Sequence, residues 1–253
     1  MKFAIVVSKQ DIAGMNIAKH LEKLGIPVHR EEKDIIYLEN IDKNQEIKDY
    51  DFIIFASLHK GAKSKLLSMH APGNWKQADF GGKPEKVCKT SALFLKHMFK
   101  ILNKNKENYP ASLEVTHHGP YIEKTCCFIE IGSNEEDWKD EKAAEIIAET
   151  IKQAITSKPD KAKIAIGLGG PHYCPNFNKI QLNSDYAIGH IIPEYILPLT
   201  KEIILEAISK TKEKPEIILL DWKGLGNSEQ KQEIINLLNS QELRYKRTSE
   251  VEK

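Results

Sequence analysis

Cys-x-x-Cys motifs and long apolar runs are both missing from this sequence of 253 residues. The four cysteines form no Cys-x-x-Cys pair, and at this density we expect no disulfide framework, so a reducing compartment fits best. No apolar stretch is long enough to span a bilayer, and the run at 3–7 is too short for the core of a signal peptide. We therefore expect a cytoplasmic protein with no membrane partner.

An excess of charge of one sign is also missing. Lys and Arg number 37 and Asp and Glu number 36, so the formal net charge is +1. This balance excludes acidic or basic tail proteins and most disordered chains, while 41% hydrophobic residues are ordinary for a globular domain. The net charge therefore gives no sign of a nucleic-acid partner, and we expect that the protein does not bind DNA.

The common signature motifs of nucleotide-binding proteins and hydrolases are absent. There is no P-loop, and the glycines at 167, 169 and 170 do not complete a dinucleotide-binding motif because His172 stands at the position of its last glycine. The zinc-protease pattern His-Glu-x-x-His and the Gly-x-Ser-x-Gly elbow are missing too. Any chemistry must therefore come from a less common arrangement.

Short apolar runs alternate with amphipathic stretches, which is the pattern of an α/β domain. The runs that predict strands are 3–7, 34–38, 52–56, 113–116, 126–131, 163–168, 186–192, 216–221 and 243–246. The predicted helices begin after Asp11 and lie also at 90–103, 137–157, 200–210 and 228–239. We predict one domain over 1–253, a three-layer α/β/α sandwich with a mostly parallel mixed sheet.

A long stretch at 57–89 has no clear periodicity, and a loop of this length is usually functional. From 57 to 100 there are nine lysines and two acidic residues, a local charge of +7. A basic loop with interleaved aromatics suits phosphate contact and base stacking, although a charge run can also be a solvated face. The substrate-binding residues predicted here are Lys60, Lys63, Lys65, His70, Trp75 and Lys76.

Histidines gather at the ends of predicted strands. In open α/β sheets, the loops that leave the carboxyl ends of the strands build the site, and imidazole and carboxylate groups are zinc ligands. We predict metal ligation by His117 and His172, and also by His190 and Glu194 if their segment turns helically. The predicted catalytic residues are His118, Glu114, Glu130 and His59. Hydrogen-bonded loop histidines without a metal are the alternative.

The segment 167–180 is rich in residues with special backbone or ring properties. Gly169 and Gly170 permit close backbone approach, and their amides could hold an oxyanion. Tyr173 and Phe177 offer ring faces to a substrate, and Cys174 is either a soft ligand or a buried thiol. The alternative is a simple glycine-rich turn.

Four separated blocks together carry a family resemblance. The segments SLHKGAKSKLLSMHAPGNW, EVTHHGPY, GLGGPHYCPNFNKI and GHIIPEY resemble the archaeal and plant type of D-aminoacyl-tRNA deacylase. The resemblance implies a phosphorylase/hydrolase-like α/β fold and hydrolysis of the ester between a D-amino acid and the tRNA 3′ end. It also implies one or two Zn²⁺ ions and the acceptor end of D-aminoacyl-tRNA as partner, in a monomer or weak homodimer.

Two other functions stay open at this point. A zinc peptidase or amidohydrolase acting on free peptides would have no use for the basic segment, and its activity would be insensitive to salt. A non-catalytic RNA-binding protein would bind tRNA without metal and without turnover.

Overall fold

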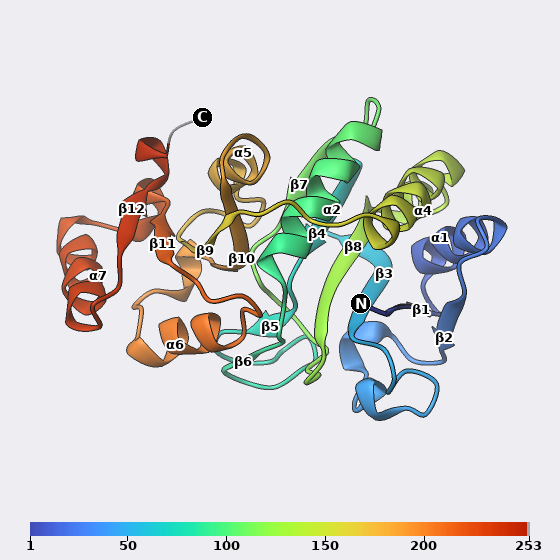
Figure 1. The fold of residues 1–253 in the computed structure, drawn as a ribbon, viewed down its shortest axis with the longest axis horizontal. Coiled ribbons are helices and arrows are strands. Elements are labelled where there is room, and N and C mark those ends of the chain that lie inside the picture. Colours follow the sequence, from blue (N-terminus) through green and yellow to red (C-terminus); the bar gives the residue numbers. More distant parts are fainter. Residues whose placement is uncertain (252–253) are drawn as a thin grey trace.

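The chain folds into two larger β-sheets, described by a computed structural model for residues 1–251 (Figure 1). The order of the first sheet is β2 (Val28–Glu31), β1 (Phe3–Ser8), β3 (Phe52–Lys60), β8 (Thr125–Ser133), β4 (Leu66–His70) and β7 (Ala111–Leu113). The second has the order β10 (Tyr186–Ile192), β9 (Lys163–Leu168), β11 (Ile217–Leu220) and β12 (Tyr245–Arg247). All neighbours are parallel except β4 and β8, so the predicted mostly parallel mixed sheet is confirmed.

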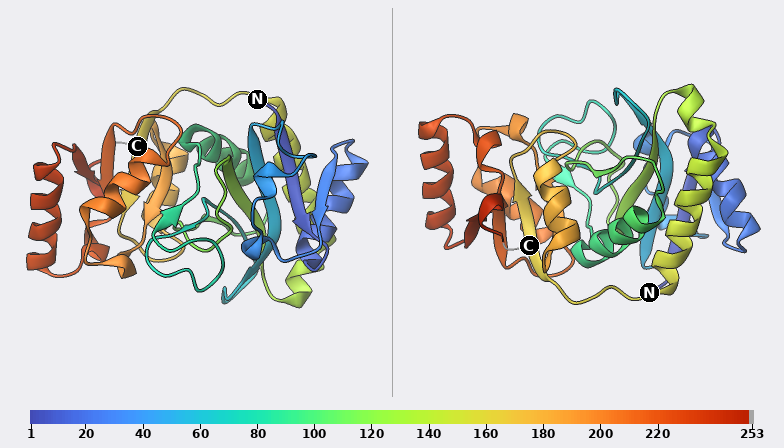
Figure 2. Two further views of the ribbon diagram at one scale, coloured as in Figure 1. Left: turned by 90° about the horizontal axis from the view of Figure 1, so that it is seen from below. Right: turned by 90° about the horizontal axis from the view of Figure 1, so that it is seen from above.

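Seven helices accompany the sheets within residues 1–251. They are α1 (Ile12–Lys23), α2 (Ala92–Asn105), α3 (Glu135–Trp138), α4 (Glu141–Thr156), α5 (Pro175–Asn183), α6 (Lys201–Ser209) and α7 (Ser228–Ser240). Helices α1 and α4 lie side by side, and α2 lies between α4 and α5 in the middle of the molecule (Figure 2). No helix of this part of the chain is both long and apolar enough to cross a membrane.

Three local predictions were wrong. The run 34–38 forms a 3₁₀ turn at Ile35–Tyr37, because the Asp34 carboxylate accepts the backbone N–H of Ile36 and ends the extended conformation. Strand β2 pairs with β1 on the side away from β3. It was missed in the sequence because it is an edge strand and has no apolar run. The stretch 57–89 is not a single loop, since it holds the end of β3, all of β4, and the small antiparallel ribbon of β5 (Gly73–Asn74) and β6 (Lys86–Val87).

Strands β7 and β8, which follow one another after α2, are not neighbours in the sheet. Strand β4 lies between them, parallel to β7 and antiparallel to β8. Its five residues come from the stretch without visible periodicity, so the pairing could not be seen locally. The inserted strand places His70 beside Phe128 and Ser68 beside Glu130.

The first sheet has one face covered by helices and one covered by loops. Ile54, Cys127 and Ile129 join the large core with α1, α2 and α4, whereas Phe55 and Phe128 face 3₁₀ turns and loops. Side chains alternate along a strand, so the loop-covered face continues from apolar to polar toward the carboxyl ends of β3 and β8. The residues there are Ser57, His59 and Glu130, with Ser57 directly opposite Glu130.

A buried lysine ties α2 to the second sheet. The Lys96 side chain is almost wholly buried, and its Nζ donates to the carbonyls of Gln181, Ser184 and Tyr186 at 2.6, 2.8 and 2.8 Å. Two of these carbonyls belong to the last turn and C-cap of α5, where a cation is favoured by the helix dipole.

We expect Lys96→Met to lower the free energy of unfolding by about 3 kcal/mol, because buried carbonyls would lose their donor. Urea unfolding of the two forms measures this. Lys100→Met, on the same helix but exposed, is the matched control and is expected to change stability by no more than about 0.5 kcal/mol. Equal effects of the two variants would contradict a structural role for the Lys96 ammonium.

Candidate metal centre and active-site cavity

The functional side chains meet where the two sheets join. The segment that follows β7 bridges the sheets, since Val115 N donates to His172 O and Thr116 N donates to Ile191 O, both at 3.0 Å. It carries Glu114, His117 and His118 to the ends of β3, β4 and β9. The cluster assembled there is His59, His70, Glu114, His117, His118, Glu130 and His172.

Three histidines form a cage of converging nitrogens. The Nδ1 atoms of His70, His117 and His118 lie 3.2, 2.8 and 2.7 Å from the carbonyl oxygens of Ala71, Val115 and Gly119. A carbonyl only accepts, so each Nδ1 carries the proton and each Nε2 keeps a lone pair. The three ligand nitrogens lie within 4.8 Å of one another, and Nε2 of His70 is buried without a hydrogen-bond partner. We call this group the histidine cage.

Two of the cage histidines have lowered pKa values. Burial, together with the nearby His70, lowers the pKa of His118 to about 4. Burial also holds the pKa of His117 well below its usual range, again with a contribution from His70. Neutral imidazole is the form that binds a metal ion, so His117 and His118 need no deprotonation before they can do so.

Two buried glutamates lie against the cage. Glu130 Oε2 lies 3.6 Å from His70 Nε2, and Glu114 Oε2 lies 3.5 Å from His117 Nε2. Ser57 Oγ donates to Glu130 Oε1 at 2.7 Å and fixes that carboxylate. Burial would raise the pKa of both carboxyl groups, but the hydrogen bond from His172 to Glu114 and the imidazoles of His59 and His70 beside Glu130 hold the two pKa values below the ordinary one.

The donor set fits a zinc ion. Glu130 Oε2 and His70 Nε2 are both buried without a hydrogen-bond partner. Their separation of 3.6 Å is too long for a hydrogen bond, but two ligands of one tetrahedral zinc ion lie about 3.4 Å apart. A cation between these groups would satisfy buried atoms that otherwise cost free energy.

A second group of possible ligands already makes hydrogen bonds. It consists of His59, Glu114 and His172. His172 Nε2 lies 2.6 Å from Glu114 Oε2, and His59 Nε2 lies 3.0 Å from the Tyr173 hydroxyl. These are hydrogen-bond distances, so this group differs from the cage, whose Nε2 atoms converge without such partners.

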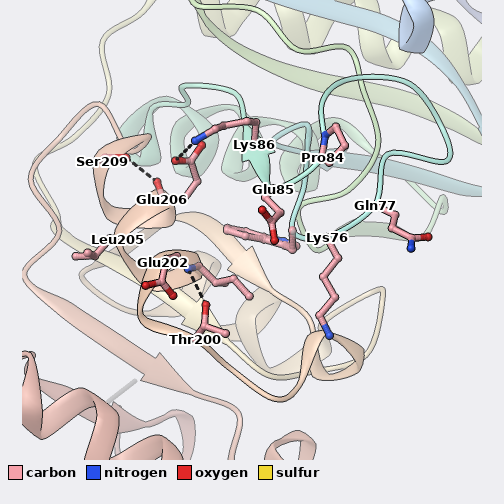
Figure 3. A pocket seen from close by; sticks show the side chains of 12 residues that line it. Lys76, Gln77, Pro84, Glu85, Lys86, Thr200, Glu202, Leu205, Glu206 and Ser209 are labelled. Carbon is pink, nitrogen blue, oxygen red and sulfur yellow. Dashed lines mark hydrogen bonds and ion pairs between the residues drawn. The ribbon is translucent and has the colours of Figure 1, made fainter.

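The cage lies beneath a cavity of about 580 Å³. His117, His118 and His172 line it together with Trp75, and its mouth is formed by residues 76–80 and by Tyr195 and Ile196. A larger hollow of about 910 Å³ lies next to it, between residues 84–86 and α6 (Figure 3). It shares Trp75, Lys76 and Gln77 with the first but contains none of the histidines, so we place the chemistry in the smaller cavity.

Comparison with known proteins shows the family of the chain. The family model of D-aminoacyl-tRNA deacylase matches residues 46–246. The chain belongs to the D-aminoacyl-tRNA deacylase family. It is 39% identical to the D-aminoacyl-tRNA deacylase of Pyrococcus furiosus over 87% of this chain and 90% of that protein. The corresponding protein of Methanococcus vannielii is 35% identical, over 91% and 94%.

A solved structure has the same fold. The crystal structure of AF0625, a conserved protein of unknown function, matches with a TM-score of 0.90 and 31% identity, over 99% of this chain and 96% of that one. The family resemblance read from the sequence blocks is therefore confirmed, and so is the α/β fold class.

The structure does not bring two of the predicted metal ligands to the cluster. His190 is fully buried on β10, and its ring nitrogens lie 3.0 Å from Thr116 Oγ1 and 3.3 Å from Lys210 O. Glu194 is exposed and begins a 3₁₀ turn after Pro193, so the two side chains share no helical face. Neither belongs to the groups of possible ligands among the described residues.

The structure places four predicted substrate-binding residues in other contacts. Trp75 is buried and donates from Nε1 to Thr116 O at 3.0 Å, Phe177 lies in the apolar core, and His70 belongs to the cage. The Gly169 amide donates to Ile192 O at 2.8 Å and is not free for an oxyanion.

Gly170 and Cys174 are also explained by local contacts. Gly170 lies beside the Asp221 carboxylate, which would repel an oxyanion. The buried Cys174 thiol donates to Leu113 O at 3.3 Å, so the interpretation of a structural thiol holds.

The sequence predicted different roles for the adjacent residues His117 and His118, a metal ligand and a catalytic residue. Neighbours on a strand point to opposite faces, so the sequence predicted that only one would ligate. His118 has φ +40°, a left-handed backbone conformation, and this brings both rings to one place with centroids 4.3 Å apart. His70 was missed as a ligand because it ends a strand that the sequence pattern did not indicate.

Proposed function

We propose that this chain hydrolyses the ester between a D-amino acid and the tRNA 3′ end, with one zinc ion in the histidine cage. The observation that carries the proposal is the set of three anchored imidazoles, with Nε2 atoms converging beneath a cavity large enough for a small ligand. Family membership supplies the substrate class. Bound zinc would supply Lewis acidity, which polarises an ester carbonyl and acidifies water.

His172 is the residue placed to move protons. It lines the cavity, its side chain is one-third exposed, and it holds the buried Glu114 carboxylate at 2.6 Å. This is the pairing in which a carboxylate orients an imidazole and stabilises its protonated form. His172 would take the proton of the attacking water and return it to the ribose oxygen that leaves.

The remaining polar groups position this pair and balance its charge. His59 lies 3.3 Å from Glu114 and 3.5 Å from Glu130, between the two carboxylates. Burial lowers the pKa of His59, but the nearby carboxylates of Glu130 and Glu114 outweigh burial and raise it. Glu130 would complete the metal site from below, oriented by Ser57.

The acceptor end would be held by only part of the basic segment. Lys65 is paired with Asp140 at 2.6 Å and with Asp137 at 3.6 Å, which makes it a poor phosphate ligand. Lys60, Lys63 and Lys76 are exposed. Lys60 ends β3 directly after His59, and Lys63 lies in the segment that follows β3.

We expect Lys63→Ala to raise KM equally for all D-aminoacyl-tRNAs and to reduce the slope of log KM against log salt by about one, because one phosphate contact is lost. Lys65→Ala is the matched comparison and should leave the slope unchanged, since its ammonium is already neutralised. Kinetics at four salt concentrations test both. Equal slopes for Lys63→Ala and the unmodified protein would exclude Lys63 as a phosphate contact.

The compartment and assembly belong to the same proposal. All four cysteines are buried and free, which suits a reducing cytoplasm, where aminoacyl-tRNA is used. A monomer or weak homodimer stays the prediction for the assembly.

The direct test is incubation of the protein with matched D- and L-aminoacyl-tRNA, with and without a chelator. We expect release of the D-amino acid only, loss of this activity on chelation, and its return when zinc is added. Salt-insensitive cleavage of a small peptide would instead indicate a peptidase. Tight tRNA binding with no bound metal and no turnover would indicate an RNA-binding protein.

A further inference from the structure

The mouth of the cavity carries two strongly exposed aromatic rings. Phe80 is 65% exposed and Tyr195 is 57% exposed, and they are the two most exposed large hydrophobic residues of the described chain. They come from segments more than a hundred residues apart, yet both line the cavity whose floor is formed by His117, His118 and His172. Exposed apolar groups that gather at one opening indicate a binding surface.

The backbone beneath Phe80 is anchored. Phe80 O accepts the N–H of Gly119, next to the cage residue His118, and Asn74 donates from Nδ2 to Gly81 O at 2.8 Å. Gly81 has φ +72°, and a Cβ there would lie 1.8 Å from a backbone oxygen, so no larger residue fits. The ring therefore projects from a backbone held in place.

Tyr195 is fixed in a similar way. It lies in the 3₁₀ turn Glu194–Ile196, whose start is attached to the second sheet because Glu194 N donates to Gly170 O at 3.1 Å. Ile196 N donates to Pro193 O at 3.1 Å and closes the turn. The backbone that carries each ring thus needs little ordering when a ligand binds, and this favours affinity.

The charge at the mouth of the cavity is too small for RNA to be bound there by phosphate contacts alone. The charged side chains of the lining are one lysine, Lys76, and one carboxylate, Asp79. The net charge of the mouth is therefore close to zero. Affinity for a polyanion at this point must come from the rings, and unpaired bases stack on such rings whatever their sequence.

We propose that Phe80 and Tyr195 form a stacking clamp for the unpaired nucleobases at the 3′ end of the RNA, and so bring the terminal ester to the histidine cage. This deepens the proposed function and rests on it. The last nucleotides must cross the mouth if the ester is to reach the floor. A clamp that reads base faces rather than base edges accepts every tRNA, because all tRNAs end in the same unpaired bases.

The test is steady-state deacylation of D-alanyl- and D-tyrosyl-tRNA by Phe80→Ala, Tyr195→Ala and the double variant. Each single variant is expected to raise KM about five- to 150-fold, as for loss of one stacked base, with kcat within about twofold. The salt dependence of KM should be unchanged. Phe80→Tyr and Tyr195→Phe, which keep a ring, should retain the KM of the unmodified protein, whereas Phe80→Leu should behave like Phe80→Ala.

A matched control lies on another surface. Tyr245→Ala removes an exposed ring on β12, outside the cavity, and should leave KM unchanged. A KM increase confined to D-tyrosyl-tRNA would mean that the rings hold the amino-acid side chain and would overturn the clamp, as would an unchanged KM in the double variant.

Failure of the clamp can be distinguished from failure of the proposed function. If the unmodified protein hydrolyses no D-aminoacyl-tRNA, the proposed function fails. The clamp is then still tested by fluorescence anisotropy with an uncharged RNA hairpin ending in the three unpaired 3′ bases. Weaker binding by the double variant supports the clamp, and equal binding excludes it.

Discussion

Replacement of His118 by Asn is expected to remove the bound metal and to lower kcat/KM for D-aminoacyl-tRNA by about a thousandfold or more. The imidazole is one of three converging nitrogens of the cage, and the Lewis acidity that it supports contributes several kcal/mol to the barrier. Asn is chosen because it tolerates the left-handed backbone at this position, so the fold should survive. Metal analysis of the purified protein and single-turnover kinetics measure the two effects.

The same measurements on His117→Ala should agree with those on His118→Asn, since both residues belong to the cage. His97→Ala is the control, because His97 lies on α2 and contacts Ser157, away from the cavity. Full metal content in both cage variants would show that the ion, if any, is bound elsewhere. Loss of metal with full activity would show that hydrolysis does not need it.

Replacement of His172 by Ala is expected to lower kcat by about 10²- to 10⁴-fold while one equivalent of metal is retained. His172 has a hydrogen-bonded carboxylate partner and faces the cavity, so its loss removes proton transfer rather than a ligand. The combination of retained metal and lost turnover separates this role from metal ligation, which the sequence alone had favoured for His172.

Glu114→Gln provides a second measurement of the same pair. The amide keeps the shape of the side chain but no longer stabilises a protonated imidazole, so kcat should fall less than in His172→Ala and its pH profile should change. An unchanged pH profile in Glu114→Gln would contradict the positioning role. If His172→Ala lost its metal instead, His172 would be a ligand and another group would move the proton.

Local sequence patterns were sufficient for the regular elements with an apolar run or a strong helical face. β9 and β10 lie at the residues that the apolar runs indicated, and Asp11 caps α1 through its side chain. The patterns failed where neighbours along the chain do not decide the conformation. β4 is held by pairing with β7 and β8, whose residues lie more than forty positions further along the chain.

The charge of the chain shows a similar division. The sequence correctly located a basic stretch within a nearly neutral chain, but it could not show that acids elsewhere approach it. Asp140 neutralises Lys65 and Glu206 neutralises Lys86, while Lys96 is buried as a helix cap. The summed charge of the segment therefore overstated how many of its lysines are free to contact phosphate groups.

The sequence by itself determined the family, the alternation of helices and strands, and the chemical types available for a site, because these follow from residue identity and local spacing. Which histidines act together was decided by the tertiary structure. A left-handed turn at His118, a strand inserted between β7 and β8, and carbonyls that fix three Nδ1 protons bring His70, His117 and His118 to one point. The same packing buries His190 among hydrogen bonds, although its sequence context looked equally suitable. Convergence of ligands depends on contacts between distant segments, and no local pattern records them.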